Sequence, residues 1–263
     1  MSRTVPRALT IAGSDSGGCA GIQADLKTFT ALGVFGMSVV TSVTAQNTRS
    51  VLGMHDLPQE FVELQIDAVL GDIGADAVKL GMLPNENIVS SVAKKLGEYG
   101  TDKIIVDPVM VSTSGVLLSD TGALKAIVRD ILPVTHIVMP NLPESEVLTG
   151  EKVESVDDMK EAARKIKALG PDYVLIKGGH LILRDAVDVL YDGSEFTEYR
   201  APRISTGNTH GGGCTYSAAV CAYLAKGMSA HEALKGAKHY VTQAIAKSFD
   251  LGHGPLNHFW KFE

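Results

Sequence analysis

Three consecutive glycines followed by a cysteine, at residues 211–214, are the part of this sequence whose residue types and spacing most clearly suggest chemistry. Glycines supply no side chain for packing, but they allow successive backbone N–H groups to converge. A small-residue helix is expected directly afterwards, at 215–226, and a helix N-terminus carries about half a unit of positive charge. The run therefore predicts a cradle for a phosphate, which would stabilise a phosphoryl group during its transfer.

Cys214 closes this run and has several possible roles. At a helix N-terminus its thiolate would be stabilised by the helix dipole, and a thiolate can accept a proton from a substrate hydroxyl. A plain small residue at a helix start is the alternative. Cys19, Cys214 and Cys221 show no CxxC or CxxH spacing, which favours a reducing compartment over a disulfide or zinc site. Cys221, two turns further on, is expected in the core.

The elements that must position this chemistry alternate between strands and helices. Short apolar runs predict strands, and apolar residues at helical spacing predict helices between them. The expected strands are 8–13, 38–45, 77–82, 103–106, 136–139 and 173–176, with a hairpin of 186–191 and 195–200; the expected helices are 20–32, 61–70, 87–99, 121–131, 155–169, 215–226 and 229–247. This alternation predicts one α/β domain over residues 1–263, a three-layer α/β/α sandwich with a mostly parallel sheet and a small antiparallel hairpin.

Polar residues and glycines follow the ends of these strands. Ligands of open α/β sheets bind beyond the carboxyl ends of the strands, so these residues should share a site. The stretch GSDSGGCAG at 13–21 lacks the Lys-Ser/Thr of a Walker A loop and the G-x-G-x-x-G spacing of a dinucleotide-binding dehydrogenase. It is either a tight strand–helix turn or a turn that binds a small molecule.

Composition limits the class of partner. A net charge of −6 and an isoelectric point near 5.8 argue against binding to nucleic acid or to an anionic membrane. The apolar run near the start spans five residues, and no stretch approaches the ~18 apolar residues of a membrane span. We therefore expect a soluble, cytoplasmic protein that acts on small molecules.

Six segments together resemble a known family. They are residues 8–48, VKLGML (78–83), DPVM (107–110), PNLPESEVLTG (140–150), IKGGH (176–180) and THGGGCT (209–215). In this order they resemble the ribokinase-like small-molecule kinases, in the branch that phosphorylates hydroxymethylpyrimidine and vitamin B6 compounds. The resemblance covers nearly the whole chain. It implies a ribokinase-like fold, use of ATP and Mg²⁺, transfer of the γ-phosphate to a hydroxymethyl group, and a homodimer.

The resemblance also implies roles for individual residues. The pyrimidine pocket would be lined by Gly13, Asp25, Gln46 and Met82, with Gln46 hydrogen-bonded to the ring. The ATP site would be formed by Asp107, Asn141, Glu144, Lys177, Thr209 and Gly211. Glu144 and Asp107 would hold Mg²⁺ through the ATP phosphates or water. Gly211, Gly212 and Gly213 would form the anion hole, and Cys214 would stand where many relatives carry an aspartate base.

Two details favour the pyrimidine over vitamin B6. The chain reads AQNT at 45–48, and residues 111–115 lack the cysteine that B6 kinases tend to carry there. Pyridoxine or pyridoxal phosphorylation is the main alternative. A non-catalytic vitamin-binding regulator is a further one, but it predicts loss of Cys214, Lys177 or Glu144, and all three are present. Gly212 and Cys19 depart from the pattern of the family, and the stretch 111–117 is the candidate for a loop that closes over the substrate.

Overall fold

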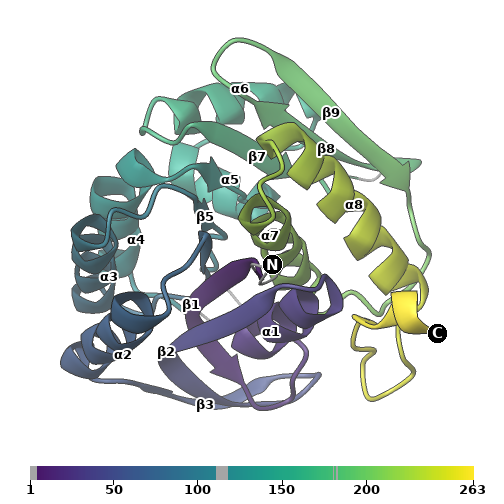
Figure 1. Ribbon diagram of the computed structural model, residues 1–263. Coiled ribbons are helices and arrows are strands. Elements are labelled where there is room, and N and C mark those ends of the chain that lie inside the picture. Colours follow the sequence, from purple (N-terminus) through teal and green to yellow (C-terminus); the bar gives the residue numbers. More distant parts are fainter. Residues whose placement is uncertain (1–4, 111–117, 180, 182) are drawn as a thin grey trace.

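The computed structural model describes residues 5–110, 118–179, 181 and 183–263 (Figure 1). Within these residues the chain forms a nine-stranded sheet of order β3-β2-β1-β4-β5-β6-β7-β8-β9. The strands are β1 (Arg7–Asp15), β2 (Phe35–Gln46), β3 (Val51–Asp56), β4 (Ala77–Leu80), β5 (Ile104–Val106), β6 (Ile137–Val138), β7 (Tyr173–Lys177), β8 (Asp185–Tyr191) and β9 (Phe196–Pro202). The helices are α1 (Gly21–Ala31), α2 (Gln59–Asp72), α3 (Glu86–Glu98), α4 (Thr121–Ala126), α5 (Leu142–Thr149), α6 (Val156–Lys167), α7 (Gly212–Ala225) and α8 (Ala230–Ala246).

The six strands β2, β1, β4, β5, β6 and β7 pair in parallel, as the alternation of strands and helices predicts. The expected hairpin exists as β8 and β9, and β8 pairs antiparallel with β7, so the hairpin extends the same sheet. At the opposite edge β3 pairs antiparallel with β2. The predicted three-layer α/β/α sandwich with a mostly parallel sheet is confirmed.

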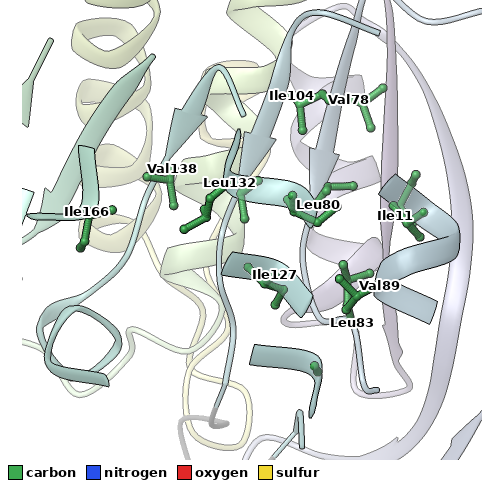
Figure 2. Close-up of a cluster of buried hydrophobic side chains, with 14 of the residues drawn as sticks. Ile11, Val78, Leu80, Leu83, Val89, Ile104, Ile127, Leu132, Val138 and Ile166 are labelled. Atoms are coloured by element: carbon green, nitrogen blue, oxygen red, sulfur yellow. The ribbon is translucent and has the colours of Figure 1, made fainter. Parts of the chain in front are cut away.

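Alternate residues of each strand pack on opposite faces, because successive side chains of a strand point in opposite directions. In β5, Ile104 and Val106 join the apolar cluster under α2, α3, α4 and α6, part of which Figure 2 shows. Ile105 faces the second cluster, which α1, α7 and α8 cover. Helices therefore enclose the sheet on both sides (Figure 1). None of the helices in the described part of the chain is both long and apolar enough to cross a membrane.

Three elements differ from the sequence prediction. No strand was expected at β3 and no helix at α5. The predicted helix 121–131 begins as α4 but continues as a π-helical turn, Ile127–Ile131, and a 3₁₀ turn, Leu132–Val134. The proposed lid, residues 111–117, lies outside the described residues.

Strand β1 lies at the point where the chain changes direction across the sheet, with β2 on one side and β4 on the other. Open α/β sheets bind ligands in the crevice at such a point, beyond the carboxyl ends of the strands. Helix α7 packs across β1, β4 and β5 on one face of the sheet. Its first turn therefore belongs to the same region as the loops that follow these strands.

Candidate active site

A cavity of about 400 Å³ lies beyond the carboxyl ends of the parallel strands. This volume falls in the range of pockets that bind small molecules. Among the residues proposed from the sequence, those that line it are Gly13, Gln46, Met82, Asp107, Asn141, Glu144, Lys177, Thr209, Gly211, Gly212, Gly213 and Cys214. The structure thus brings together residues from almost every segment of the chain that resembles the kinase family.

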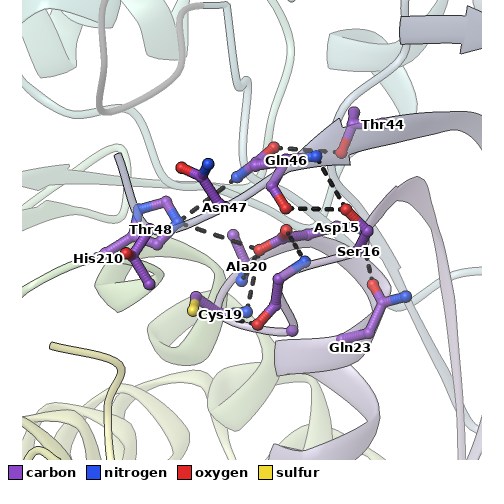
Figure 3. Close-up of polar contacts among 12 residues, drawn as sticks. Asp15, Ser16, Cys19, Ala20, Gln23, Thr44, Gln46, Asn47, Thr48 and His210 are labelled. Carbon is purple, nitrogen blue, oxygen red and sulfur yellow. Dashed lines mark hydrogen bonds and ion pairs between the residues drawn. The ribbon is translucent and has the colours of Figure 1, made fainter. Parts of the chain in front are cut away.

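One group of lining residues surrounds Gln46, the last residue of β2. Its side-chain Nε2 lies 3.4 Å from Nε2 of His210, and its Oε1 accepts a hydrogen bond of 3.3 Å from Thr44 Oγ1 (Figure 3). Gly13 lies beside Met82: a Cβ on Gly13 would come within 2.7 Å of the Met82 methyl carbon. Glycine at this position therefore leaves room for Met82, and Gln46 is held in a defined orientation.

The loop between β1 and α1 is organised by the Asp15 carboxylate. Oδ1 accepts a hydrogen bond from the Gly17 N–H at 2.8 Å, and Oδ2 accepts from the N–H groups of Cys19 and Ala20 at 2.9 and 2.8 Å (Figure 3). His210 Nε2 lies 4.0 Å from the same Oδ2 atom. The loop that the sequence singled out at 13–21 is thus a tight turn that also borders the cavity.

Asp25 is a correction to the predicted pyrimidine pocket, because it does not line the cavity. Its carboxylate is fully buried behind the cavity wall, 2.8 Å from Lys79 Nζ, and accepts a hydrogen bond of 2.6 Å from Thr10. Lys79 lines the cavity instead. Burial opposes the charge on Lys79, but Asp25, Cys214 and Asp107 outweigh it and raise the lysine pKa. Lys79 therefore remains a cation, and Asp25 is the group that holds it in place.

Two carboxylates and one lysine form the charged centre of the cavity. Asp107 follows β5, Lys177 ends β7, and Glu144 lies in the first turn of α5. Lys177 Nζ is 2.5 Å from Asp107 Oδ1 and 4.0 Å from Glu144 Oε2. Ser217 Oγ donates a hydrogen bond of 3.0 Å to Asp107 Oδ2. A lysine between two carboxylates can bind phosphate oxygens, and the carboxylates offer the oxygen ligands that Mg²⁺ prefers.

Burial acts on both carboxyl groups, but the nearby charges and hydrogen bonds separate their pKa values. Burial alone would raise the pKa of Asp107, but the charges of Lys177 and Lys79 and the bonds from Lys177 and Ser217 bring it below its ordinary value. Burial raises the pKa of Glu144 to about 7, with Asp107 adding to the shift and Lys177 opposing it. Asp107 is therefore ionised at neutral pH, while Glu144 exchanges a proton readily.

Helix α5 explains how Glu144 is placed. Asn141 caps the helix: its side chain accepts a hydrogen bond of 2.9 Å from the Glu144 N–H, and Glu144 Oε2 accepts one of 2.7 Å from the Asn141 N–H. This capping box uses one oxygen of Glu144 and fixes the carboxylate next to Lys177. The helix ends at Gly150, which adopts the left-handed conformation.

The glycine run forms the start of α7, three residues earlier than expected. Gly211 caps the helix with a φ of 82°, and Gly212 to Cys214 form its first turn. A Cβ on Gly211 would lie 1.8 Å from the Cys19 carbonyl oxygen, so this position requires glycine. The Gly212 N–H donates to Thr209 O at 3.0 Å. The N–H groups of Gly213 and Cys214 belong to the first turn, which has no intrahelical acceptors for them. Gly213 also lies close to Lys177, because a Cβ on Gly213 would be 3.5 Å from Lys177 Nζ.

The expectation of a stabilised Cys214 thiolate is wrong. Burial raises the pKa of Cys214 to about 11, although Lys79 acts to lower it and the Gly21 N–H favours the anion by hydrogen bonding. Asp25 and Asp107 add to the increase. The effect of burial is therefore larger than the opposing effects of Lys79 and the Gly21 N–H, and the side chain is a neutral thiol at neutral pH.

Comparison with known proteins decides the family. The family model for phosphomethylpyrimidine kinase matches residues 15–258. The chain belongs to this kinase family. It is 47% identical to the hydroxymethylpyrimidine/phosphomethylpyrimidine kinase of Bacillus subtilis, over 97% of this chain and 96% of that protein. It is 50% identical to the thiamine biosynthesis bifunctional protein ThiED of Geobacter sulfurreducens over 95% of this chain, which spans about half (51%) of that longer protein.

The fold of this phosphomethylpyrimidine kinase family member is shared with solved structures. The pyridoxal kinase of Staphylococcus aureus, in complex with AMP-PCP and pyridoxal, matches it with a TM-score of 0.91 and 36% identity, over 98% of this chain and 95% of that one. The ribokinase-like fold implied by the sequence is thereby confirmed. The polar side chains at the site that the sequence did not point to include Lys79, Ser217 and His210 in its contact with Gln46. Lys79 had a signal, because it is the one charged residue in the run AVKL of β4.

Proposed function

We propose that this protein is an ATP-dependent kinase that phosphorylates the hydroxymethyl group of 4-amino-5-hydroxymethyl-2-methylpyrimidine and then its monophosphate, as a step of thiamine biosynthesis. The observation that carries this proposal is one cavity in which Lys177, Asp107 and Glu144 adjoin the first turn of α7 and the Gln46 group. Membership of the phosphomethylpyrimidine kinase family supports the same activity. The S. aureus relative in complex with AMP-PCP supports ATP as the phosphoryl donor.

The two ends of the reaction have separate binding groups. Lys177 and the N–H groups of Gly213 and Cys214 would bind the transferred phosphoryl group, because they present positive charge and hydrogen-bond donors to one region. Gln46 would bind the ring through its amide, as the family resemblance implies. Asn141 contributes by fixing Glu144, and Thr209 by bonding to the Gly212 N–H.

Glu144 and Asp107 would hold Mg²⁺, directly or through water. The donor set fits this ion, since both groups are carboxylates and lie on either side of Lys177. Mg²⁺ would neutralise charge on the phosphate oxygens. Glu144, with a pKa of about 7, would release its proton when the cation binds.

Cys214 would accept the proton of the substrate hydroxyl. Only the thiolate can do so, and the buried Lys79 ammonium favours that form by its charge. The hydroxymethyl oxygen would then bond to the γ-phosphorus, the bond from this phosphorus to the bridging oxygen would break, and ADP would leave. Lys79, held by Asp25, therefore places a positive charge that opposes the rise in the Cys214 pKa.

The vitamin B6 alternative rests on a specific observation: the S. aureus structure that matches this chain is a pyridoxal kinase. We place that activity second, because the curated B. subtilis relative is more similar in sequence and carries the pyrimidine name. A non-catalytic regulator is the least supported alternative, since all the groups needed for transfer share one cavity. A homodimer in the cytoplasm remains a proposal from the family resemblance, which light scattering and fractionation would test.

The deciding experiment measures ATP consumption with hydroxymethylpyrimidine, its phosphate, pyridoxine and pyridoxal side by side. We expect the two pyrimidines to support the fastest turnover. Faster turnover with a B6 compound would reverse the order of the two proposals. The Cys214→Ala variant gives the background rate of ATP consumption. No turnover above this background with any of the four compounds would refute the kinase assignment.

A further inference from the structure

A carboxylate, a thiol and an imidazole gather beside the cavity and have no part in the proposed phosphoryl transfer. They belong to Asp15, Cys19 and His210, and their closest possible ligand atoms all lie within 4.8 Å of one another. Asp15 ends β1 and Cys19 lies in the loop before α1, whereas His210 comes from the segment before α7 (Figure 3). The fold therefore joins two distant parts of the sequence at this cluster.

The backbone fixes where these three side chains lie. Asp15 is held by the N–H groups of Gly17, Cys19 and Ala20. These bonds use three of the roughly four lone-pair positions of a carboxylate, two on Oδ2 and one on Oδ1, which leaves one position on Oδ1 for a further partner. The Cys19 carbonyl oxygen packs so closely on Gly211 that no Cβ would fit between them. The loop with Cys19 and the segment with His210 are thus pressed together.

The chemistry of the three donors favours one kind of ion. His210 offers a ring nitrogen, the commonest nitrogen ligand of metal ions in proteins. Cys19 is 1% exposed, and a bound cation would displace its proton. Sulfur, nitrogen and oxygen together suit Zn²⁺ far better than Mg²⁺, which prefers oxygen alone.

The three ligand atoms lie within 4.8 Å of one another. His210 Nε2 lies 4.0 Å from Asp15 Oδ2. Bond lengths to Zn²⁺ of about 2.0–2.3 Å bring ligand atoms to roughly 3.5 Å from one another. A rotation of the His210 side chain towards the fixed loop would close this difference. The same rotation would move Nε2 away from Gln46, from which it now lies 3.4 Å.

We propose that Asp15, Cys19 and His210 form a binding site for Zn²⁺, with the fourth ligand position open to water at the Gln46 side of the cavity. Occupation of this site takes His210 from Gln46 and so weakens binding of the pyrimidine. This second, inhibitory effect rests on the proposed function; the binding of the metal does not.

Binding is tested with Co²⁺ as a spectroscopic substitute for Zn²⁺, on the full chain without substrate. We expect one equivalent to bind, to give the near-ultraviolet absorption of a thiolate–cobalt bond, and to be displaced by Zn²⁺. The Cys19→Ser variant should lose this absorption. Cys214→Ser, which removes the other thiol of this region, should keep it. No absorption with the unmodified protein, its retention in Cys19→Ser, or its loss in Cys214→Ser would overturn the site.

A second variant protects this test from a folding defect. His210→Ala leaves the β1–α1 loop unchanged and should weaken Co²⁺ binding by at least about tenfold, since even outer partners of a metal are worth 10–100-fold in affinity. Circular dichroism of each variant checks that it is folded. Unchanged affinity in a folded His210→Ala variant would also refute the site.

Inhibition is measured as turnover of hydroxymethylpyrimidine at saturating magnesium–ATP and buffered free Zn²⁺. We expect Zn²⁺ to raise KM for the pyrimidine with little change in kcat, and Cys19→Ala to require at least about tenfold more Zn²⁺ for the same effect. Equal inhibition of both proteins would overturn the inhibitory effect. If no substrate supports turnover at all, the proposed function fails while the Co²⁺ result still decides the metal site.

Discussion

Replacing Glu144 by glutamine should make the protein more stable than its parent at high pH, but not at low pH. In the folded protein burial raises the pKa of this carboxyl from an ordinary 4.5 to about 7. Folding therefore favours the protonated form, so its stability contribution is fully present below about pH 4.5 and is lost as the pH rises through 7. The difference of 2.5 pKa units, at about 1.36 kcal/mol each, amounts to about 3 kcal/mol.

Glutamine is a close match for the protonated acid at this position. Its amide oxygen can accept the hydrogen bond that Glu144 Oε2 accepts from the Asn141 N–H, so the capping box at the start of α5 is kept. Glutamine also remains neutral at every pH, so the cost of burying a charge disappears. The two proteins should thus be about equally stable near pH 4.5 and differ progressively above it.

The assay is urea denaturation of both proteins at several values between pH 5 and 8, without nucleotide or Mg²⁺. The free energy of unfolding of Glu144→Gln, minus that of the parent, should rise by about 2–3 kcal/mol across this range. Other titrating groups are common to both proteins and largely cancel in the difference. A difference that does not change with pH, or that falls as the pH rises, would refute the argument that burial dominates at Glu144.

Three further predictions concern the cavity. Cys214→Ala should lower turnover by roughly 10²–10⁴-fold with unchanged ATP affinity. Turnover of the parent should rise with pH above 7 as the thiolate forms, because burial raises the pKa of Cys214 to about 11. Normal turnover of the variant, or a parent turnover that does not change with pH, would refute the role of Cys214 as the base. Gln46→Ala should raise KM for the pyrimidine and not for ATP in steady-state kinetics, and an unchanged KM would exclude the contact. Gly211→Ala should destabilise the protein by more than about 1 kcal/mol in a thermal melt, since its Cβ would meet the Cys19 carbonyl. Gly212→Ala should be neutral or stabilising by up to about 1 kcal/mol. Equal effects of the two substitutions would contradict the conclusion that only Gly211 must be glycine.

Much of the fold followed from patterns that act locally. Apolar strands between amphipathic helices identified the sheet, and the predicted helix 229–247 exists as α8, which begins with a capping box of Ser229 and Glu232. Strand β3 was missed because most of it is exposed, with Leu52 at 76%, so its sequence carries no alternation of buried and exposed side chains. Its existence depends on pairing with β2, which is a tertiary contact.

Helix α5 was missed for a different reason. The segment PNLPESEVLTG has two prolines and no helical stripe of apolar residues, yet Pro143 lies in the first turn, where proline is tolerated because its missing N–H would have no intrahelical partner. Asn141 and Glu144 carried the signal for the helix start. An Asn followed three residues later by a Glu predicts a helix start, with Glu144 in the first turn of the helix.

The site was predictable as a set of residues but not as a set of charges. The rule that ligands bind at strand ends placed Gln46, Asp107 and Lys177 in one cavity, as observed. The position of Asp25 behind Lys79 and the high pKa of Cys214 arise from burial, which no spacing in the sequence reports. Gly212 is also explained: no atom of the described residues lies within 4 Å of where its Cβ would be, so the position tolerates a side chain and does not require one.

Helix α7 follows all nine described strands in the chain and yet packs across β1, β4 and β5. During synthesis, the ribosome therefore completes the strands that carry Asp107 and Lys177 before it makes the helix whose first turn would bind phosphate. Until α7 and α8 emerge, the face of the sheet with Ala8, Ile105 and Leu175 is covered by α1 alone. A nascent chain that ends at β9 would expose much of this apolar face to chaperones. It would also lack the first turn of α7, which the proposed function assigns to phosphate binding. The proposed phosphate site and the apolar core are therefore completed by the same helix.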